Sequence, residues 1–186
     1  MKRIILRLFN APFLILIAVM GTAIQTSLFV WKPIAVFQPQ ITLLLVLWCA
    51  FEREFLEGGI LTLILANLAE IHSAAISGLY LVSYMSIFLA VRGSAKLMLV
   101  DQRNGRAVVA GFAALANSMI LISVLHLLKS AQFEVSVVSL VLSSLAQLPY
   151  AYFGFPLLRR FDWKTFKSDR AHQALEDESL IEAEGF

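Results

Sequence analysis

The sequence predicts an all-α integral membrane protein, a bundle of about six transmembrane helices with both termini in the cytoplasm. Of its 186 residues, 59% are hydrophobic and only 15% are charged, whereas an average soluble domain is about half apolar and about a quarter charged. Uncharged stretches near spanning length recur along the chain, and a spanning helix needs about 20 mostly apolar residues. The basic residues also segregate between alternate connections. These three observations favour a multi-pass membrane protein.

The uncharged stretches define the expected helices in order. They are residues 8–31, 33–51, 58–69, 71–91, 107–128 and 135–158. The first resembles a signal peptide at its basic start, but its apolar run continues to Trp31 and no A-x-A site precedes a polar sequence. We therefore expect an uncleaved first helix. The second stretch begins with Pro33 and contains Trp48. Trp31, Trp48 and Trp163 are expected near a membrane interface.

The third stretch is short, because only residues 58–69 separate Glu57 from Glu70. At about 1.5 Å per residue it crosses a bilayer only if Phe55 and Leu56 extend it. The alternative is one long helix over residues 58–91, which would reach about 51 Å and exceed the bilayer thickness. Two helices joined by a tight turn around residues 72–73 are therefore expected.

The fifth and sixth stretches carry small and polar residues at helical spacing. Residues 107, 110, 111, 114 and 118 form one such set, and residues 136, 139, 143, 147 and 151 form the other. Small residues let helices approach closely, and amides bond between helices, so Asn117 and Gln147 are expected to make interhelical hydrogen bonds. The pattern fits plain bundle packing or a polar groove for a partner helix. Pro149 and Pro156 are expected to kink the last helix.

Orientation follows from the basic residues. If the N-terminus is inside, 13 of the 15 Lys and Arg residues fall on the inner side, and only Lys32 and Lys129 fall outside. Residues 1–167 are then a polytopic membrane domain. Residues 168–186 form an acidic cytoplasmic tail, either a frayed helix over residues 171–183 or a disordered segment.

Few residues suggest chemistry. The single Cys49 excludes an internal disulfide, the net charge of +2 gives no case for nucleic-acid binding, and the three histidines lack metal-ligand spacing. We expect no catalytic, cofactor or metal site, and we interpret the cluster of Glu52, Arg53, Glu54 and Glu57 as a solvated charged loop. Glu70 and His72 lie near the membrane, and Asn67 shares the helix face of Glu70 at i, i+3. They form either a polar cluster that binds a partner or solute, or a wet interfacial loop.

Several segments together resemble the rod shape-determining MreD family. They are Phe-Gln-Pro-Gln at 37–40, Glu-Arg-Glu-Phe-Leu-Glu-Gly-Gly at 52–59, Asn-Leu-Ala-Glu at 67–70, Ser-Gly-Leu at 77–79, Ala-Gln-Leu-Pro at 146–149 and Phe-Pro-Leu-Leu-Arg-Arg at 155–160. The family commonly has Gly-Leu-x-x-Asp where this chain has Asn67-Leu68-Ala69-Glu70. The resemblance covers residues 1–167.

The resemblance implies a fold related to the substrate-binding subunit of vitamin transporters. It also implies a non-enzymatic scaffold of the bacterial cell-wall elongation complex in the inner membrane. Its partners would be an MreC-like single-span periplasmic protein, the MreB filament, a SEDS glycosyltransferase, a class B penicillin-binding protein and the lipid bilayer. The basic connection over residues 92–106 would face the filament or anionic lipid.

The residues expected to bind a partner are Asn67, Glu70, His72, Gly78, Asn117, Ser139, Ser143, Gln147 and Pro149. The alternative function is a substrate-binding membrane subunit of a small-solute transporter. In that case Asn67, Glu70, His72, Asn117 and Gln147 would converge on a pocket open to the outside.

Overall fold

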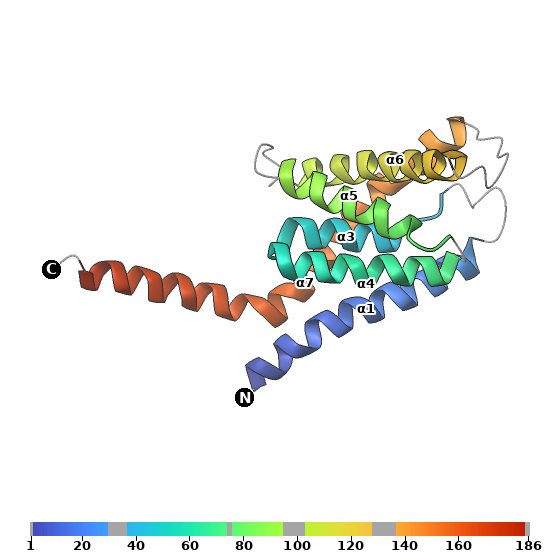
Figure 1. Cartoon of the computed structure of the whole chain (residues 1–186). Coiled ribbons are helices and arrows are strands. Elements are labelled where there is room, and N and C mark those ends of the chain that lie inside the picture. Colours follow the sequence, from blue (N-terminus) through green and yellow to red (C-terminus); the bar gives the residue numbers. More distant parts are fainter. Residues whose placement is uncertain (1, 30–36, 74–75, 95–102, 128–136, 185–186) are drawn as a thin grey trace.

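The computed structural model describes residues 2–29, 37–73, 76–94, 103–127 and 137–184, and these residues form helices without any strand. Figure 1 shows a bundle from which the end of α7 extends away. The helices are α1 (Lys2–Leu28), α3 (Ile41–Glu52), α4 (Phe55–Ser73), α5 (Leu79–Ser94), α6 (Arg103–Leu127) and α7 (Val137–Glu184). The predicted all-helical class is therefore confirmed for the described part of the chain.

Four of these helices, α1, α4, α6 and α7, are long and apolar enough to cross a membrane. This agrees with a multi-pass membrane protein. The apolar helices α3 and α5 are shorter, at 12 and 16 residues. At about 1.5 Å per residue they reach about 18 and 24 Å. The six predicted stretches thus each contribute a helix, and four of those helices have spanning length.

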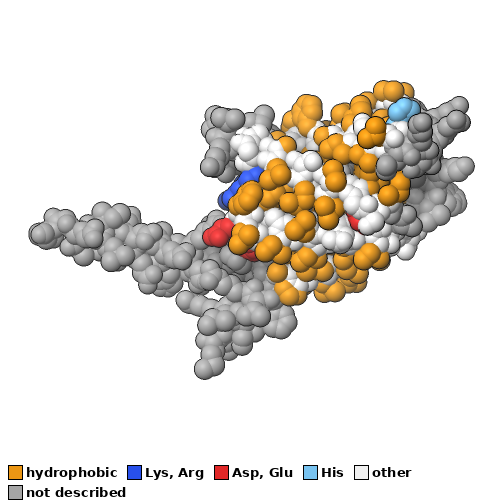
Figure 2. Space-filling view, viewed as in Figure 1, with side chains coloured by type: hydrophobic (Ala, Val, Ile, Leu, Met, Phe, Trp, Pro, Cys, Tyr) orange, Lys and Arg blue, Asp and Glu red, His pale blue; other side chains and the backbone are white. Residues whose placement is uncertain are grey.

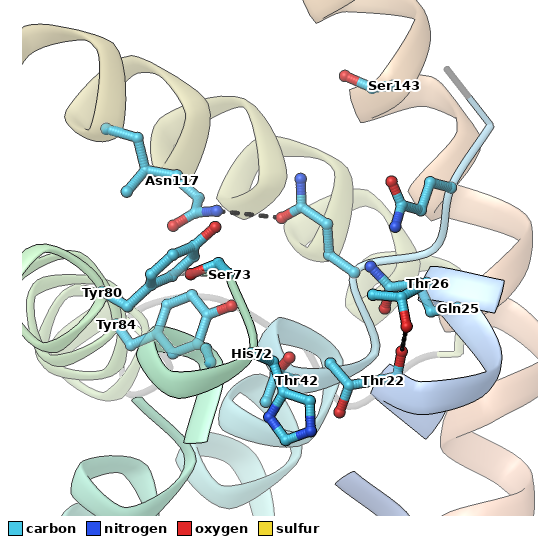
Figure 3. Close-up of a pocket in the computed structure, with 14 residues that line it drawn as sticks. Thr22, Gln25, Thr26, Thr42, His72, Ser73, Tyr80, Tyr84, Asn117 and Ser143 are labelled. Carbon is cyan, nitrogen blue, oxygen red and sulfur yellow. Dashed lines mark hydrogen bonds between the residues drawn. The ribbon is translucent and has the colours of Figure 1, made fainter. Parts of the chain in front are cut away.

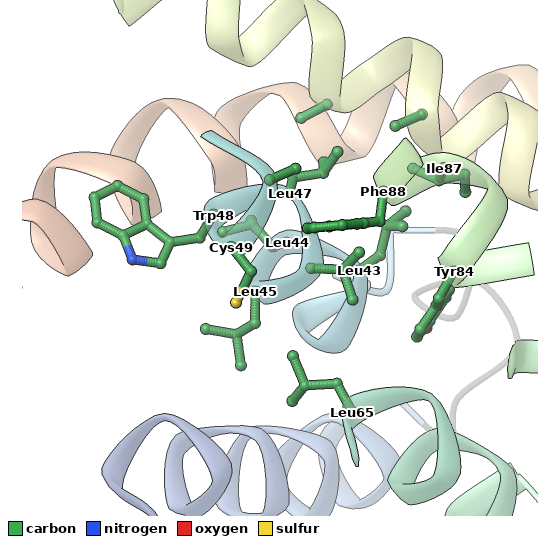
Figure 4. Packing of buried hydrophobic residues seen from close by; sticks show 14 of the residues in the cluster. Leu43, Leu44, Leu45, Leu47, Trp48, Cys49, Leu65, Tyr84, Ile87 and Phe88 are labelled. Atoms are coloured by element: carbon green, nitrogen blue, oxygen red, sulfur yellow. The ribbon is translucent and has the colours of Figure 1, made fainter. Parts of the chain in front are cut away.

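Helix α3 is the central helix of the bundle. Residues 42–50 are all buried, and Trp48 and Phe88 are among the largest fully buried side chains (Figure 4). A helix that is apolar on every side is stable only when other elements surround it. It is shorter than the predicted stretch 33–51 because Pro39, which has no amide hydrogen, precedes its start and disfavours helical backbone at the residue before it.

Helix α4 is longer than its uncharged stretch. It begins at Phe55, as the extension by Phe55 and Leu56 predicted, and continues through Glu70 to Ser73. The turn expected around residues 72–73 therefore comes later. Gly78, immediately before α5, has a φ of +89°, a backbone conformation that favours glycine.

Small residues pack α6 against its neighbours. Ala110 and Ala114 have no exposed surface. A Cβ atom on Gly111 would lie 2.9 Å from the Leu148 Cδ2 atom of α7, so this glycine permits the close approach of α6 and α7. Bundle packing therefore uses this small-residue set.

Helix α7 is continuous through Pro149 and Pro156 and runs on to Glu184. Each proline removes the amide that would bond to the carbonyl four residues earlier. The backbone of the acidic tail is helical through residue 184, which agrees with the helix over residues 171–183 rather than with the disordered alternative, and this helix is continuous with α7.

Candidate functional site

A hydrogen-bonded amide network connects α7 to the segment before α3. Gln147, which is fully buried on α7, accepts a hydrogen bond from the backbone amide of Gln40 at 2.9 Å and donates one to the Gln40 carbonyl at 3.2 Å. One side-chain amide thus bonds to both backbone groups of Gln40. The Gln40 carbonyl also accepts the amide of Leu44 at 3.0 Å, as the residue before a helix does, whereas the Gln40 amide takes its partner from α7.

Asn117 extends the network to α5 and α6. Its Oδ1 atom accepts a hydrogen bond from the Ser83 hydroxyl at 2.6 Å, and its Nδ2 atom donates to the Gln40 Oε1 atom at 3.1 Å. Asn117 is only 2% exposed. The predicted interhelical hydrogen bonding of Asn117 and Gln147 is confirmed, and Gln40 is the residue that joins them.

This network borders a polar pocket of about 280 Å³ (Figure 3). The pocket is lined by Thr22, Gln25, Thr26, Gln38, Gln40, Thr42, Ala69, His72, Ser73, Tyr80, Tyr84, Asn117, Leu121 and Ser143. These residues come from the C-terminal halves of α1, α4 and α6, from the segment before α3 and from the N-terminal halves of α3, α5 and α7. We call this end of the bundle the pocket end. Exposed residues such as Thr26 and Ser73 lie at its rim.

Three of the predicted site residues, His72, Asn117 and Ser143, line this pocket. The His72 Nδ1 atom donates to the Leu68 carbonyl at 2.9 Å, and the Ser143 hydroxyl donates to the Leu140 carbonyl. A carbonyl only accepts, so the His72 Nδ1 atom carries a proton.

Glu70 lies outside this lining. Its Oε1 atom accepts a hydrogen bond from the backbone amide of Leu81 at 3.1 Å, in the first turn of α5. A carboxylate there satisfies an amide that has no partner within the helix and interacts favourably with the helix dipole. Glu70 therefore caps α5.

The other predicted residues do not converge on the pocket. Asn67 is exposed and donates to the Leu63 carbonyl of its own helix. Ser139 and Pro149 are exposed on α7. Gly78 forms the turn before α5.

Sequence reasoning missed the contribution of α1 and α5. Thr22, Gln25 and Thr26 form one wall of the pocket, and Tyr80 and Tyr84 form another. The signal was present in α1, since these three polar residues at i, i+3 and i+4 share one face of an otherwise apolar helix.

The opposite end of the bundle, which we call the charged end, is held by ion pairs. Arg53 is 3% exposed, and its guanidinium contacts Asp162 of α7 at 2.7 Å and Glu57 of α4 at 3.2 Å. Arg106 of α6 contacts Glu52 of α3 at 2.6 Å. In Figure 2, charged side chains gather at the end from which α7 leaves, beside a mostly hydrophobic face.

One expectation about this end was wrong for Arg53. The charged segment 52–57 was interpreted as a solvated loop, yet Arg53 is buried between α3, α4 and α7. Trp48 is 1% exposed, and its Nε1 atom donates to Asp162 at 3.0 Å. Trp31 and Trp163 lie outside the part of the chain whose side chains are described.

An apolar groove of about 190 Å³ lies between α6 and α7 on the outside of the bundle. It is lined by Val108, Gly111, Phe112, Leu115, Val141, Ser144, Leu145 and Leu148. Ser144 is the only polar residue in the described lining, and its hydroxyl donates to the Leu140 carbonyl within α7. The groove therefore offers an apolar surface about two helical turns long.

The described residues contain no group of three His, Cys, Asp or Glu side chains placed to hold a metal ion. The pocket offers hydroxyls, amides and one imidazole, and the groove offers apolar side chains. The fold and these sites define a helical protein with four helices able to span a membrane. Comparison of the chain with models of protein families, with curated proteins and with solved structures finds no match.

Proposed function

We propose that this protein is a non-enzymatic membrane scaffold of the bacterial cell-wall elongation complex, a member of the MreD family that binds an MreC-like single-span protein. In this proposal the bundle spans the inner membrane six times, with its fold related to vitamin-transporter substrate-binding subunits. Both termini are cytoplasmic, so the charged end faces the cytoplasm and the pocket end faces outward. The wider complex includes the MreB filament, a SEDS glycosyltransferase and a class B penicillin-binding protein.

The hydrogen bonds between Gln40 and Gln147 are the observation that carries the proposal. The two residues are 107 positions apart, and each lies in a segment on which the MreD resemblance depends, 37–40 and 146–149. Glu70 of the segment 67–70 likewise accepts the amide of Leu81, two residues after the segment 77–79. These segments thus act together in the fold, which supports reading them as one family pattern.

The groove between α6 and α7 is the surface that we assign to the partner's transmembrane helix. Its lining is apolar, as a helix inside a bilayer requires, and the small Gly111 and Ser144 lie between larger side chains. Two helical turns accommodate two partner side chains one turn apart. Phe112 is 70% exposed within this groove, so the partner would cover it.

Site-specific photocrosslinking in living cells tests the proposal. A benzophenone side chain replaces Phe112 in the groove or Phe153 of α7, which is 68% exposed and does not line the groove. The matched pair has the same residue type and nearly the same exposure. We expect position 112 to crosslink to a single-span protein with a coiled-coil periplasmic part, and position 153 to crosslink to it weakly. Equal crosslinking at both positions, or crosslinks to lipid alone, would contradict the assignment.

The pocket favours a second candidate, a substrate-binding membrane subunit of a small-solute transporter. Of the residues first expected to line it, only His72 and Asn117 do so. A transporter subunit requires a coupled ATPase pair. Disruption of the gene distinguishes the two functions, since loss of rod shape supports the scaffold and loss of uptake of one solute with normal shape supports the transporter.

A further inference from the structure

The pocket at the pocket end is polar, and none of the described residues that line it carries a formal charge. Hydroxyl, amide and imidazole groups provide its polar surface, and Asp, Glu, Lys and Arg are absent from its described lining. An ion taken from water into such a site would lack a compensating charge. The lining therefore selects for an uncharged ligand that makes several hydrogen bonds.

The α1 wall of the pocket presents acceptors. The Thr22 hydroxyl donates to the Ala18 carbonyl, and the Thr26 hydroxyl donates to the Thr22 carbonyl at 3.0 Å. Their hydrogens are therefore used within the helix, whereas the oxygen lone pairs stay available. Among the described residues, the buried Gln25 Oε1 atom has no hydrogen-bond partner. Because a buried polar atom is normally paired, this wall fits a ligand with several donors.

The facing side combines an aromatic surface with a fixed amide. The rings of Tyr80 and Tyr84 pack edge to face, with centroids 5.4 Å apart. Asn117 is held by Ser83 and Gln40, so its orientation is set before any ligand arrives. In Figure 3 the side chains of Tyr80, Tyr84 and Asn117 lie across the pocket from those of Thr22, Gln25 and Thr26. A ligand with C–H groups between its hydroxyls matches such a surface.

We infer that this pocket binds an uncharged, polyhydroxylated solute of about monosaccharide size. A volume of about 280 Å³ lies at the small end of the range of about 300–1,000 Å³ that is usual for ligand sites, which excludes much larger ligands. Hydroxyls donate to Gln25 and to the threonine oxygens, while the C–H face of the solute lies on the tyrosines. The inference goes beyond the scaffold function and concerns a different surface from the groove.

Binding is tested on the purified full-length protein in lipid nanodiscs. Thermal unfolding is followed with glucose and inositol, and with glucosamine and gluconate as cationic and anionic counterparts of glucose. A ligand that binds only the folded state raises the Tm as its concentration rises. We expect this increase with at least one neutral compound and none with the charged pair. Equal shifts from charged and neutral compounds, or no shift from either neutral compound, would overturn the inference.

A variant of Gln25 separates binding from folding. Gln25→Leu removes the unpartnered oxygen at similar size, so it should weaken binding by about tenfold without lowering the Tm of the free protein. Ser27→Ala on the same helix is the control, since Ser27 is exposed, bonds to the Ala23 carbonyl and does not line the pocket. Unchanged affinity in Gln25→Leu contradicts the assignment. Because no partner is present, these results are independent of the crosslinking at position 112.

Discussion

The two ends of the bundle are joined by the same helices but by different chemistry. At the charged end, Arg53 connects α4 and α7 through carboxylates at 3.2 and 2.7 Å. At the pocket end, Gln147 connects α7 to Gln40 through neutral amide bonds at 2.9 and 3.2 Å. A buried charge requires an opposite charge close by, whereas amides satisfy one another without one. The described lining of the pocket is therefore free of formal charge, whereas the charged end is held together by ion pairs.

Removing the buried ion pairs at the charged end should have the largest effect on the free energy of unfolding. Arg53→Met leaves Asp162 and Glu57 without their buried partner, and loss of one member of a buried pair costs about 3–5 kcal/mol. We expect a fall of that size in the free energy of unfolding, measured by denaturant titration in detergent micelles. The control is Arg159→Met, because Arg159 is exposed on α7. Adding Asp162→Leu to Arg53→Met should recover part of the lost free energy of unfolding. If the effects of the two substitutions simply added, the Arg53–Asp162 pair would not be what holds α7 in place.

Breaking the pocket end should cost less. Gln147→Leu keeps the side-chain volume but removes both bonds to the Gln40 backbone, so we expect a loss of about 1–3 kcal/mol in the free energy of unfolding. Hydrogen exchange at the Gln40 amide is the direct measurement, and it should become faster. Gln147→Glu retains the acceptor and should protect that amide more than leucine does. An unchanged exchange rate in Gln147→Leu would mean that Gln40 is held by other contacts.

Loss of the Glu70 cap, at the rim of the pocket end, should have the smallest effect on the free energy of unfolding. Glu70→Ala removes the cap on α5 and should cost about 1 kcal/mol, as loss of a helix cap does. Glu70→Gln keeps an acceptor for the Leu81 amide and should cost less. The measurement is hydrogen exchange over the first turn of α5. Asn67→Ala on the same helix is the control, since Asn67 bonds only within α4; an equal effect there would argue against capping.

The sequence predicted the helices better than it predicted their environments. Apolar stretches located each of the six helices in the described part of the chain, because long uncharged runs are visible without knowledge of contacts. The bounds of α3 and α4 differ from those of the uncharged stretches. Helix α3 begins later because Pro39 precedes it. Helix α4 includes Glu57 and Glu70, which bounded the third stretch, because Glu57 pairs with Arg53 and Glu70 accepts the Leu81 amide.

The site was only partly predictable. Asn117 and Gln147 were visible as amides in apolar stretches, but their partner Gln40 lies 77 and 107 positions away, and periodicity carries no signal over such separations. Arg53 was misread for the same reason, since Asp162 is 109 residues later. Glu70 was predicted to bind a partner or a solute, and that stays a prediction; the contact that the structure shows is a helix cap.

The most direct test of the central claim, that this protein works by binding partners in the cell-wall elongation complex, is affinity purification from native membranes in mild detergent with quantitative mass spectrometry. The account predicts enrichment of a single-span coiled-coil protein together with a SEDS glycosyltransferase and a class B penicillin-binding protein. Enrichment of a transporter ATPase pair in their place would contradict it and make the polar pocket the main functional site.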